Sequence, residues 1–254
     1  MGSTPPRRYW LTGAGNGIGA SLAESILRTG AHLAVSSRLP CDALSARYPG
    51  QVLIVAGNLT DSQAVREAGE RIAQEWGSLD TVIINAGTAE YISGQPVDPS
   101  IIEHIVRSNL LAASLCIEAA APLLRAGNGT HLVGIASPLT YLPPSQFEAG
   151  DQGMRFLFES ARGKLARDGI DVTIVHPGFD NSSPAIDDGL PPSIRWSAET
   201  AAHHILTQLT ERPLEVILPA MTMDLLWPLP SNDTVLAGAH SRSDSYQCPI
   251  KGRP

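Results

Sequence analysis

Glycines recur near the N-terminus at a spacing that can hold a phosphate group. Residues 12–19 have the sequence Thr-Gly-Ala-Gly-Asn-Gly-Ile-Gly and follow a short apolar run at residues 9–12. Glycines permit a sharp turn and a close approach of a pyrophosphate, and the N–H groups and dipole of a following helix hold the phosphates. Because a strand-like run precedes this turn and a helical pattern follows it, we predict a dinucleotide site rather than a turn without a ligand. The residues expected to contact the dinucleotide are Gly13, Gly15, Asn16, Gly17, Ile18 and Gly19.

The residues after the second apolar run indicate which dinucleotide is bound. An acidic side chain at this place would bond the adenosine ribose diol and repel a 2′-phosphate. This chain instead has Ser37 and Arg38 after residues 32–36. An arginine pairs with a phosphate through charge-assisted, often bidentate hydrogen bonds. The pair favours NADP(H), and the alternative is that Arg38 is a solvated surface side chain.

Apolar runs of strand length alternate with helical patterns along the chain. Buried stripes at a spacing of about four residues, such as Ile18, Leu22 and Ile26, predict helices between the strands. This alternation predicts a single α/β domain, a Rossmann-type doubly wound parallel sheet with helices on both faces, over residues 1–226. A Pro-rich, irregular tail is expected at residues 227–254, although the apolar residues 221–229 could line a pocket or an oligomer contact. The expected strands are residues 9–12, 32–36, 52–56, 81–84, 130–135, 171–176 and 215–218.

Composition narrows the class of protein. The chain has 254 residues, of which 43% are hydrophobic and 17% charged, with a formal net charge of −7. An acidic chain has no electrostatic footprint for nucleic acid or an anionic membrane, and its longest apolar run, residues 110–124, is too short to span a bilayer. Cys41, Cys116 and Cys248 lack metal-ligand spacing, so no metal site and no disulfide are expected. These features predict a cytoplasmic protein that acts on a small-molecule substrate.

Several of these motifs, taken in order, resemble the short-chain dehydrogenase/reductase family. Residues 12–19 are similar to its Thr-Gly-x-x-x-Gly-x-Gly motif, and the resemblance runs from about Arg8 to Ser183. It implies an oxidoreductase that forms homodimers or homotetramers through long helices at residues 99–124 and 147–167. It also implies cofactor contacts from Asn58, Leu59, Asn85, Ala86, Gly87, Pro177, Gly178 and Ser182. Ser137 and Asn109 stand where the family has its catalytic serine and its helix asparagine.

The resemblance fails at the central catalytic pair. The family uses a Tyr, which exchanges a proton with the substrate, and a Lys four residues later, which lowers the pKa of that Tyr. About thirty residues before Pro177, where this pair belongs, the chain has Phe147 and Asp151. No Tyr-x-x-x-Lys pair occurs anywhere in the sequence. The usual carbonyl reduction is therefore not expected.

Asp151 suggests a different chemistry. A carboxylate beside the nicotinamide opposes an oxyanion but favours a cation such as an iminium, and a carboxyl with a raised pKa can itself donate a proton. Atypical family members in alkaloid biosynthesis also lack the Tyr/Lys pair and use an Asp near the cofactor. Tyr141, four residues after Ser137, is another candidate proton donor or a wall residue. The alternative is that Asp151 is a solvated helix residue in a decayed site.

Two functional hypotheses result from these residues. The first is an NADP(H)-dependent reductase of an imine, iminium or activated alkene, in which Ser137 and Asp151 orient the substrate and Asn109 holds a water or a helix carbonyl. The second is a cofactor-binding protein without hydride transfer, serving as an inactive partner subunit, a sensor or a cyclisation scaffold. Lys164 lies too far along the helix from Asp151 to replace the missing lysine.

Overall fold

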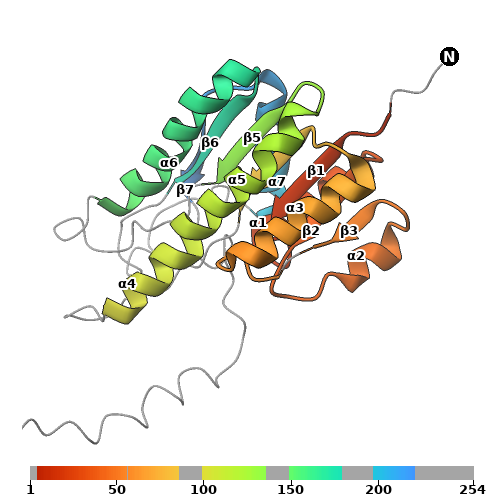
Figure 1. Cartoon of the computed structure of the whole chain (residues 1–254), viewed down its shortest axis with the longest axis horizontal. Helices are drawn as coiled ribbons and strands as arrows, with labels where there is room; N and C mark the ends of the chain where they lie inside the picture. Colours follow the sequence, from red (N-terminus) through yellow and green to blue (C-terminus); the bar gives the residue numbers. More distant parts are fainter. Residues whose placement is uncertain (1–4, 56, 86–98, 136–148, 179–196, 221–254) are drawn as a thin grey trace, which may run out of the picture.

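Seven parallel strands form one twisted sheet between two layers of helices in the computed structural model (Figure 1). The structure describes residues 5–55, 57–85, 99–135, 149–178 and 197–220. The strands are β1 (Arg8–Thr12), β2 (His32–Ser36), β3 (Val52–Ile54), β4 (Thr81–Ile84), β5 (His131–Ile135), β6 (Asp171–Gly178) and β7 (Glu215–Ala220). Their order in the sheet is β3-β2-β1-β4-β5-β6-β7, which confirms the predicted Rossmann-type fold.

The helices connect consecutive strands. They are α1 (Gly17–Arg28), α2 (Asp42–Arg47), α3 (Ser62–Trp76), α4 (Pro99–Val106), α5 (Ala112–Arg125), α6 (Ala149–Leu165) and α7 (Ala198–Gln208). Short turns of other helical types, η1 (Arg107–Leu111), η3 (Ala166–Asp168) and η5 (Leu209–Glu211), lie between or after them. Within the described ranges, none of these helices combines the length and apolarity needed to cross a bilayer.

Side-chain alternation along the strands separates the apolar interior into two layers. Trp10 of β1 packs with α3, α5 and α6 on one face of the sheet, whereas its neighbour Leu11 packs with α1 and α7 on the other. Both side chains are fully buried, as expected for a strand covered on both faces. Figure 1 shows α3 and α5 in front of the sheet and α1 and α7 behind it.

The order in which successive strands of the chain are placed in the sheet reverses between β1 and β4. β2 and β3 lie on one side of β1, and β4 to β7 continue on the other. The crevice outside the carboxyl ends of the strands at such a reversal is where doubly wound sheets bind ligands. The glycine-rich turn follows β1 at this point, so the fold positions the predicted dinucleotide site there.

Capping residues set the limits of α3. The Asp61 carboxylate accepts hydrogen bonds from the N–H groups of Gln63 and Ala64, at 2.9 and 3.4 Å. Gly77 ends the helix in the left-handed region, with φ of +74°. Both are the residue types that helix ends favour, because Asp satisfies the first N–H groups and Gly has no Cβ to strain.

Several element boundaries differ from the sequence-based predictions: β1 begins one residue earlier and β5 one residue later than expected, and β6 and β7 each end two residues later. The third strand ends at Ile54 rather than at residue 56. The long helix expected at residues 99–124 is interrupted by the π-helical turn η1, and the helix expected at 147–167 is described from Ala149 and ends in the 3-10 turn η3. The predicted tail at residues 227–254 lies outside the described residues.

Candidate functional site

The turn after β1 is built from backbone groups. Gly13 and Gly17 have φ of +68° and +53°, which residues with a side chain rarely adopt. The Gly13 N–H donates to the Ser36 carbonyl oxygen at 2.8 Å, and this bond ties the turn to the end of β2. The turn is therefore held by its neighbours before any ligand binds.

Gly19 closes the turn against the helix. A Cβ added at Gly19 would lie 1.9 Å from the Gly13 carbonyl oxygen and 2.6 Å from Asn85 Nδ2, and one added at Gly13 would lie 2.9 Å from the Asn85 carbonyl oxygen. Neither position has room for a side chain. The glycine spacing therefore reflects close packing of turn, helix and β4, as the dinucleotide fingerprint requires.

Asn85, directly after β4, links the two halves of the sheet at the reversal point. Its backbone N–H donates to Thr12 Oγ1 at 2.9 Å, and its Nδ2 donates to the Gly13 carbonyl oxygen at 3.2 Å. Its Oδ1 is buried and has no donor among the described residues. A buried acceptor without a partner is costly in a native protein, so this atom is suited to a hydrogen-bond donor on a ligand.

The first turn of α1 offers free helical N–H groups. Asn16, which precedes the helix, makes no side-chain capping bond, and the first turn of α1 contains no acidic residue. Uncapped N–H groups and the positive end of the helix dipole attract an anion, whereas an acidic side chain there would compete with it. The cradle left by Gly13 and Gly19 and this helix end together fit a pyrophosphate.

At the end of β2 stand the two residues that favour a 2′-phosphate. Ser37 Oγ accepts the Leu39 N–H at 3.0 Å, and a Cβ added at Gly15 would lie 2.3 Å from this oxygen, so Ser37 packs closely against the glycine turn. Arg38 is exposed, and no ion pair joins it to any residue that the structure describes. An unpaired guanidinium beside the turn is available to a phosphate.

Asn58 and Leu59 follow β3 on the same edge of the sheet. Asn58 Oδ1 accepts the N–H of Thr60 at 3.1 Å and its Oγ1 hydroxyl at 2.8 Å. The Leu59 side chain is 7% exposed and packs in the apolar layer beside α3. Asn58 is exposed, so its side-chain amide can face a ligand, whereas a contact from buried Leu59 would involve its backbone. The cofactor contacts of both residues stay predictions.

On the other side of the reversal, Asn109 lies in the π-helical turn η1 and is fully buried. Single π-helical turns inside α-helices occur frequently at functional sites. The helix α6, which carries Asp151 in its first turn, packs beside η1. Pro177 and Gly178 end β6.

Exposed Lys164 lies thirteen residues beyond Asp151 on α6, about 20 Å along the helix axis, which agrees with the prediction that it cannot replace the missing lysine.

Part of the predicted site lies outside the described residues. These residues are Ala86, Gly87, Ser137, Tyr141, Phe147 and Ser182. Asp151 is described only as a position on α6. In the ranges that are described, no group of His, Cys, Asp and Glu side chains could hold a metal ion.

Three buried positioning residues, Trp10, Thr12 and Ser36, were not included in the sequence-based prediction of the site. The Trp10 Nε1–H donates to Ser36 Oγ at 3.0 Å, and Thr12 Oγ1 accepts the Asn85 N–H. All three side chains of Trp10, Thr12 and Ser36 are fully buried. Thr12 is the first residue of the glycine motif, so a polar residue at that place was the available signal. The Trp10–Ser36 bond joins two strands, and the sequence pattern gives no sign of it.

This crevice and this strand order define a nucleotide-binding α/β protein of the Rossmann class. A sequence model described as short chain dehydrogenase matches residues 9–186. The chain therefore belongs to the short-chain dehydrogenase family and is an oxidoreductase of that type.

Individual relatives agree with the family. The chain is 28% identical over 240 residues to an uncharacterized oxidoreductase of Mycobacterium tuberculosis, covering 88% of this chain and 94% of the relative. It is 31% identical over 214 residues to the cis-4-hydroxycyclohexanecarboxylate dehydrogenase of Sinomonas cyclohexanicum, covering 81% and 84%.

Solved structures show the same fold. A short-chain dehydrogenase from Streptomyces avermitilis superposes with a TM-score of 0.70 at 21% identity, covering 84% of this chain and 89% of that one. A short chain dehydrogenase from Burkholderia cenocepacia in complex with NADP superposes with a TM-score of 0.67 at 25% identity, covering 85% and 97%.

Proposed function

We propose that this chain is an NADP(H)-dependent oxidoreductase whose active site differs from the family pattern at its Tyr/Lys pair. One observation carries the cofactor choice: the end of β2 has Ser37 and an exposed, unpaired Arg38 where an acid would select NAD(H). The NADP bound to the Burkholderia cenocepacia relative supports the same choice.

The described residues suit the binding of this cofactor. The Gly13–Gly19 cradle and the first turn of α1 would hold the pyrophosphate, and Arg38 would pair with the 2′-phosphate. The bound nicotinamide would supply or accept a hydride. Asn85 Oδ1, a buried acceptor without a described donor, would hydrogen-bond a hydroxyl or amide group of the ligand.

The substrate proposed for this site is a cyclic imine, an iminium or an activated alkene. An iminium accepts a hydride without needing a phenolic proton donor, so the absence of a Tyr-x-x-x-Lys pair in the sequence does not block its reduction. A carboxylate at position 151 would stabilise the cation or, when protonated, act as the acid. Ser137 would orient the substrate, Tyr141 is a second proton donor, and Asn109 would hold a water or a helix carbonyl.

The competing proposal is a cofactor-binding protein without hydride transfer. The replacement of both Tyr and Lys in the sequence favours it, and the retained glycine cradle is compatible with it. Both proposals expect phosphate-selective cofactor binding, so substrate turnover is what distinguishes them.

Calorimetric titration of the whole chain with NADPH and NADH tests the cofactor choice. The variant Arg38→Ala removes the cation and should weaken NADPH binding by roughly 10- to 100-fold, since a charge-assisted hydrogen bond contributes about 1.5–3 kcal/mol, while NADH binding changes little. Arg47→Ala is the matched control, because Arg47 is an exposed arginine paired with Glu24. Equal loss of NADPH and NADH binding in Arg38→Ala would contradict a phosphate contact.

Turnover of a cyclic imine and of cyclohexenone with NADPH tests the chemistry. Asp151→Asn should lower kcat/KM for the imine tenfold or more, because it removes the carboxylate while leaving NADPH affinity unchanged. Asp168→Asn, on η3 and paired with Arg125, is the control. Full imine turnover in Asp151→Asn would refute the role of that carboxylate. Tight NADPH binding by the unaltered chain without turnover of either probe would favour the competing proposal.

A further inference from the structure

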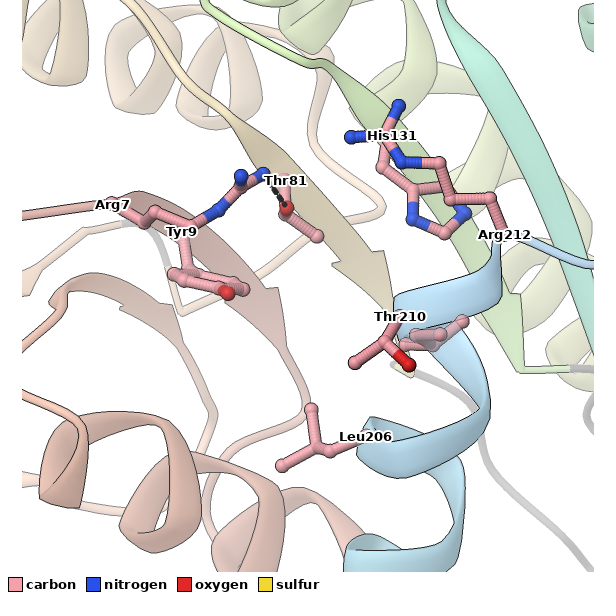
Figure 2. A pocket seen from close by; sticks show the side chains of 8 residues that line it. Arg7, Tyr9, Thr81, His131, Leu206, Thr210 and Arg212 are labelled. Carbon is pink, nitrogen blue, oxygen red and sulfur yellow. Dashed lines mark hydrogen bonds between the residues drawn. The ribbon is translucent and has the colours of Figure 1, made fainter.

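A cavity of about 320 Å³ lies at the opposite edge of the sheet from the glycine turn. It is bounded by the residue before β1, the first residues of β4 and β5, and the segment from α7 to β7 (Figure 2). Its lining residues are Arg7, Tyr9, Thr81, His131, Leu206, Leu209, Thr210 and Arg212. Because the amino ends of the strands face away from the crevice at the reversal point, this cavity is separate from the cofactor site.

Two guanidinium groups converge at this cavity. Arg7 Nη2 and Arg212 Nη2 both donate to the carbonyl oxygen of Gly129, at 3.1 and 2.6 Å. Two cations held at one carbonyl repel each other unless an anion lies close to them. Arg212 has such a partner in Asp171, whereas Arg7 forms no ion pair within the described part of the chain.

The charge of Arg7 is not compensated by the residues that line the cavity. None of the described residues that line it is an Asp or a Glu. The nearby Asp80 carboxylate is paired with the Arg8 guanidinium, with 3.3 Å between Nη2 and Oδ1. It also accepts hydrogen bonds from the backbone N–H groups of Arg8 and Asn128. All the hydrogen bonds of Arg7 use Nη2, so its Nε and Nη1 have no partner among the residues described.

Arg212 is held in an unfavourable backbone conformation. It is the only residue other than glycine with a positive φ, +52°, in the described ranges. A side chain with a Cβ is disfavoured there, and Gly or Asn would be more favourable. Arg212 takes this conformation as the residue that ends the turn η5, with its N–H bonded to the Leu209 carbonyl oxygen. A better-suited residue at this position would remove the backbone strain along with the charge.

His131 does not add to the charge. Burial lowers the pKa of its imidazole, and together with the smaller effects of Arg212 and Arg7, which Asp171 opposes, it brings that pKa to about 4. The Thr173 hydroxyl donates to the Pro213 carbonyl oxygen at 2.5 Å, so it accepts the Nε2–H of His131 at 2.8 Å. The ring is therefore neutral near pH 7, and the uncompensated positive charge of the cavity comes from Arg7, because Arg212 is paired with Asp171.

Part of the remaining wall is apolar, and Thr81 and Thr210 add polar groups to the lining. Leu206 of α7, Leu209 of η5 and the ring of Tyr9 contribute this apolar surface, and Figure 2 shows Tyr9 beside Arg7 and Leu206 farther from the two arginines. A bare inorganic anion would leave this surface uncovered, whereas a carboxylate on a ring or alkyl group would cover it while matching the planar guanidinium donors. We propose that this cavity binds a small carboxylate with an apolar body, through Arg7 and Arg212.

Calorimetric titration of the whole chain with benzoate, benzamide and inorganic phosphate tests this proposal. Benzoate should bind with one site per chain, and benzamide, its neutral counterpart, at least tenfold more weakly. Phosphate should also bind at least tenfold more weakly, because it lacks the apolar body. Benzoate affinity should be the same with and without saturating NADPH, since the two sites lie at opposite edges of the sheet.

Variants locate the site. Arg212→Asn removes the cation but keeps a residue suited to the left-handed conformation, so the variant should fold and lose benzoate affinity at least tenfold. Arg7→Gln should have the same effect. Arg125→Asn removes a comparable exposed arginine, paired with Asp168, and should leave benzoate affinity within twofold. No heat from benzoate up to about 10 mM, or affinity that survives both Arg212→Asn and Arg7→Gln, would overturn the proposal.

Discussion

The two edges of the sheet present binding groups of different kinds. At the edge where the strands have their carboxyl ends, the groups proposed for the pyrophosphate are backbone atoms of a glycine turn, with the Arg38 side chain beside it for the 2′-phosphate. The turn is packed so closely that a Cβ at Gly19 would lie 1.9 Å from the Gly13 carbonyl oxygen. At the amino edge they are long side chains, Arg7 and Arg212, around an open cavity. A site of backbone atoms is sensitive to any added volume, whereas a site of side chains is sensitive to loss of charge. The predictions below separate these two sensitivities.

The largest expected effect comes from adding one methyl group at the carboxyl edge. Gly19→Ala should lower the free energy of unfolding by about 2–4 kcal/mol, because the new Cβ meets two rigid groups, the Gly13 carbonyl and Asn85 Nδ2. Since the helix must move away from the turn, NADPH binding should be lost as well. Urea denaturation and calorimetry measure the two effects.

Gly163→Ala is the matched control for Gly19→Ala. Gly163 also lies in a helix, α6, but a Cβ there would meet no atom within 4 Å. Alanine should therefore raise the free energy of unfolding by up to about 1 kcal/mol, through the higher helix propensity of Ala. Similar destabilisation by both substitutions would show that the cost at Gly19 does not come from close packing.

A smaller, pH-dependent effect is expected at the amino edge. Burial opposes ionisation of Asp80, but the N–H groups of Arg8 and Asn128 and the Arg8 guanidinium outweigh it and lower the pKa of Asp80 below its ordinary value of 3.8. A carboxyl with a lowered pKa stabilises the fold above its ordinary pKa, and this contribution is lost as the pH falls through the folded-state value. Asp80→Asn should therefore cost about 1–3 kcal/mol at pH 7.

Urea denaturation of both proteins between pH 7 and pH 3 measures this dependence. The difference in unfolding free energy between the unaltered chain and Asp80→Asn should be constant down to about pH 5 and should shrink below about pH 4. Asp168→Asn, which removes a more exposed carboxylate, should cost less than about 1 kcal/mol at pH 7. A difference for Asp80→Asn that does not shrink in acid would contradict the lowered pKa.

The sequence predicted the fold and the carboxyl edge well because both depend on local patterns. Strand-length apolar runs identified all seven strands, and the stripe of Ile18, Leu22 and Ile26 is buried as expected. Glycines that need a positive φ or a close approach are visible in the sequence as glycines. For these features, spacing along the chain determines position in space.

The amino edge could not be predicted because it depends on contacts between distant residues. Arg7 and Arg212 are 205 positions apart in the sequence, and each alone is typical of a surface arginine. Only the parallel order of β1, β4, β5, β6 and β7 brings them to one carbonyl. The sequence also did not predict the interruption of the long helix at Asn109. Arg107–Leu111 contains neither Pro nor Gly, so no residue type in this segment indicates that the α-helix is interrupted there.

The cofactor preference of Ser37→Asp tests the central claim most directly. The Asp carboxylate can still accept the Leu39 N–H that Ser37 Oγ accepts at 3.0 Å, so the local turn is kept while a negative charge is added. If the carboxyl edge binds NADP(H) through its 2′-phosphate, calorimetry should show NADPH affinity reduced at least tenfold and NADH affinity maintained or increased. An unchanged ratio of the two dissociation constants would contradict the account, because it would place the 2′-phosphate away from the end of β2.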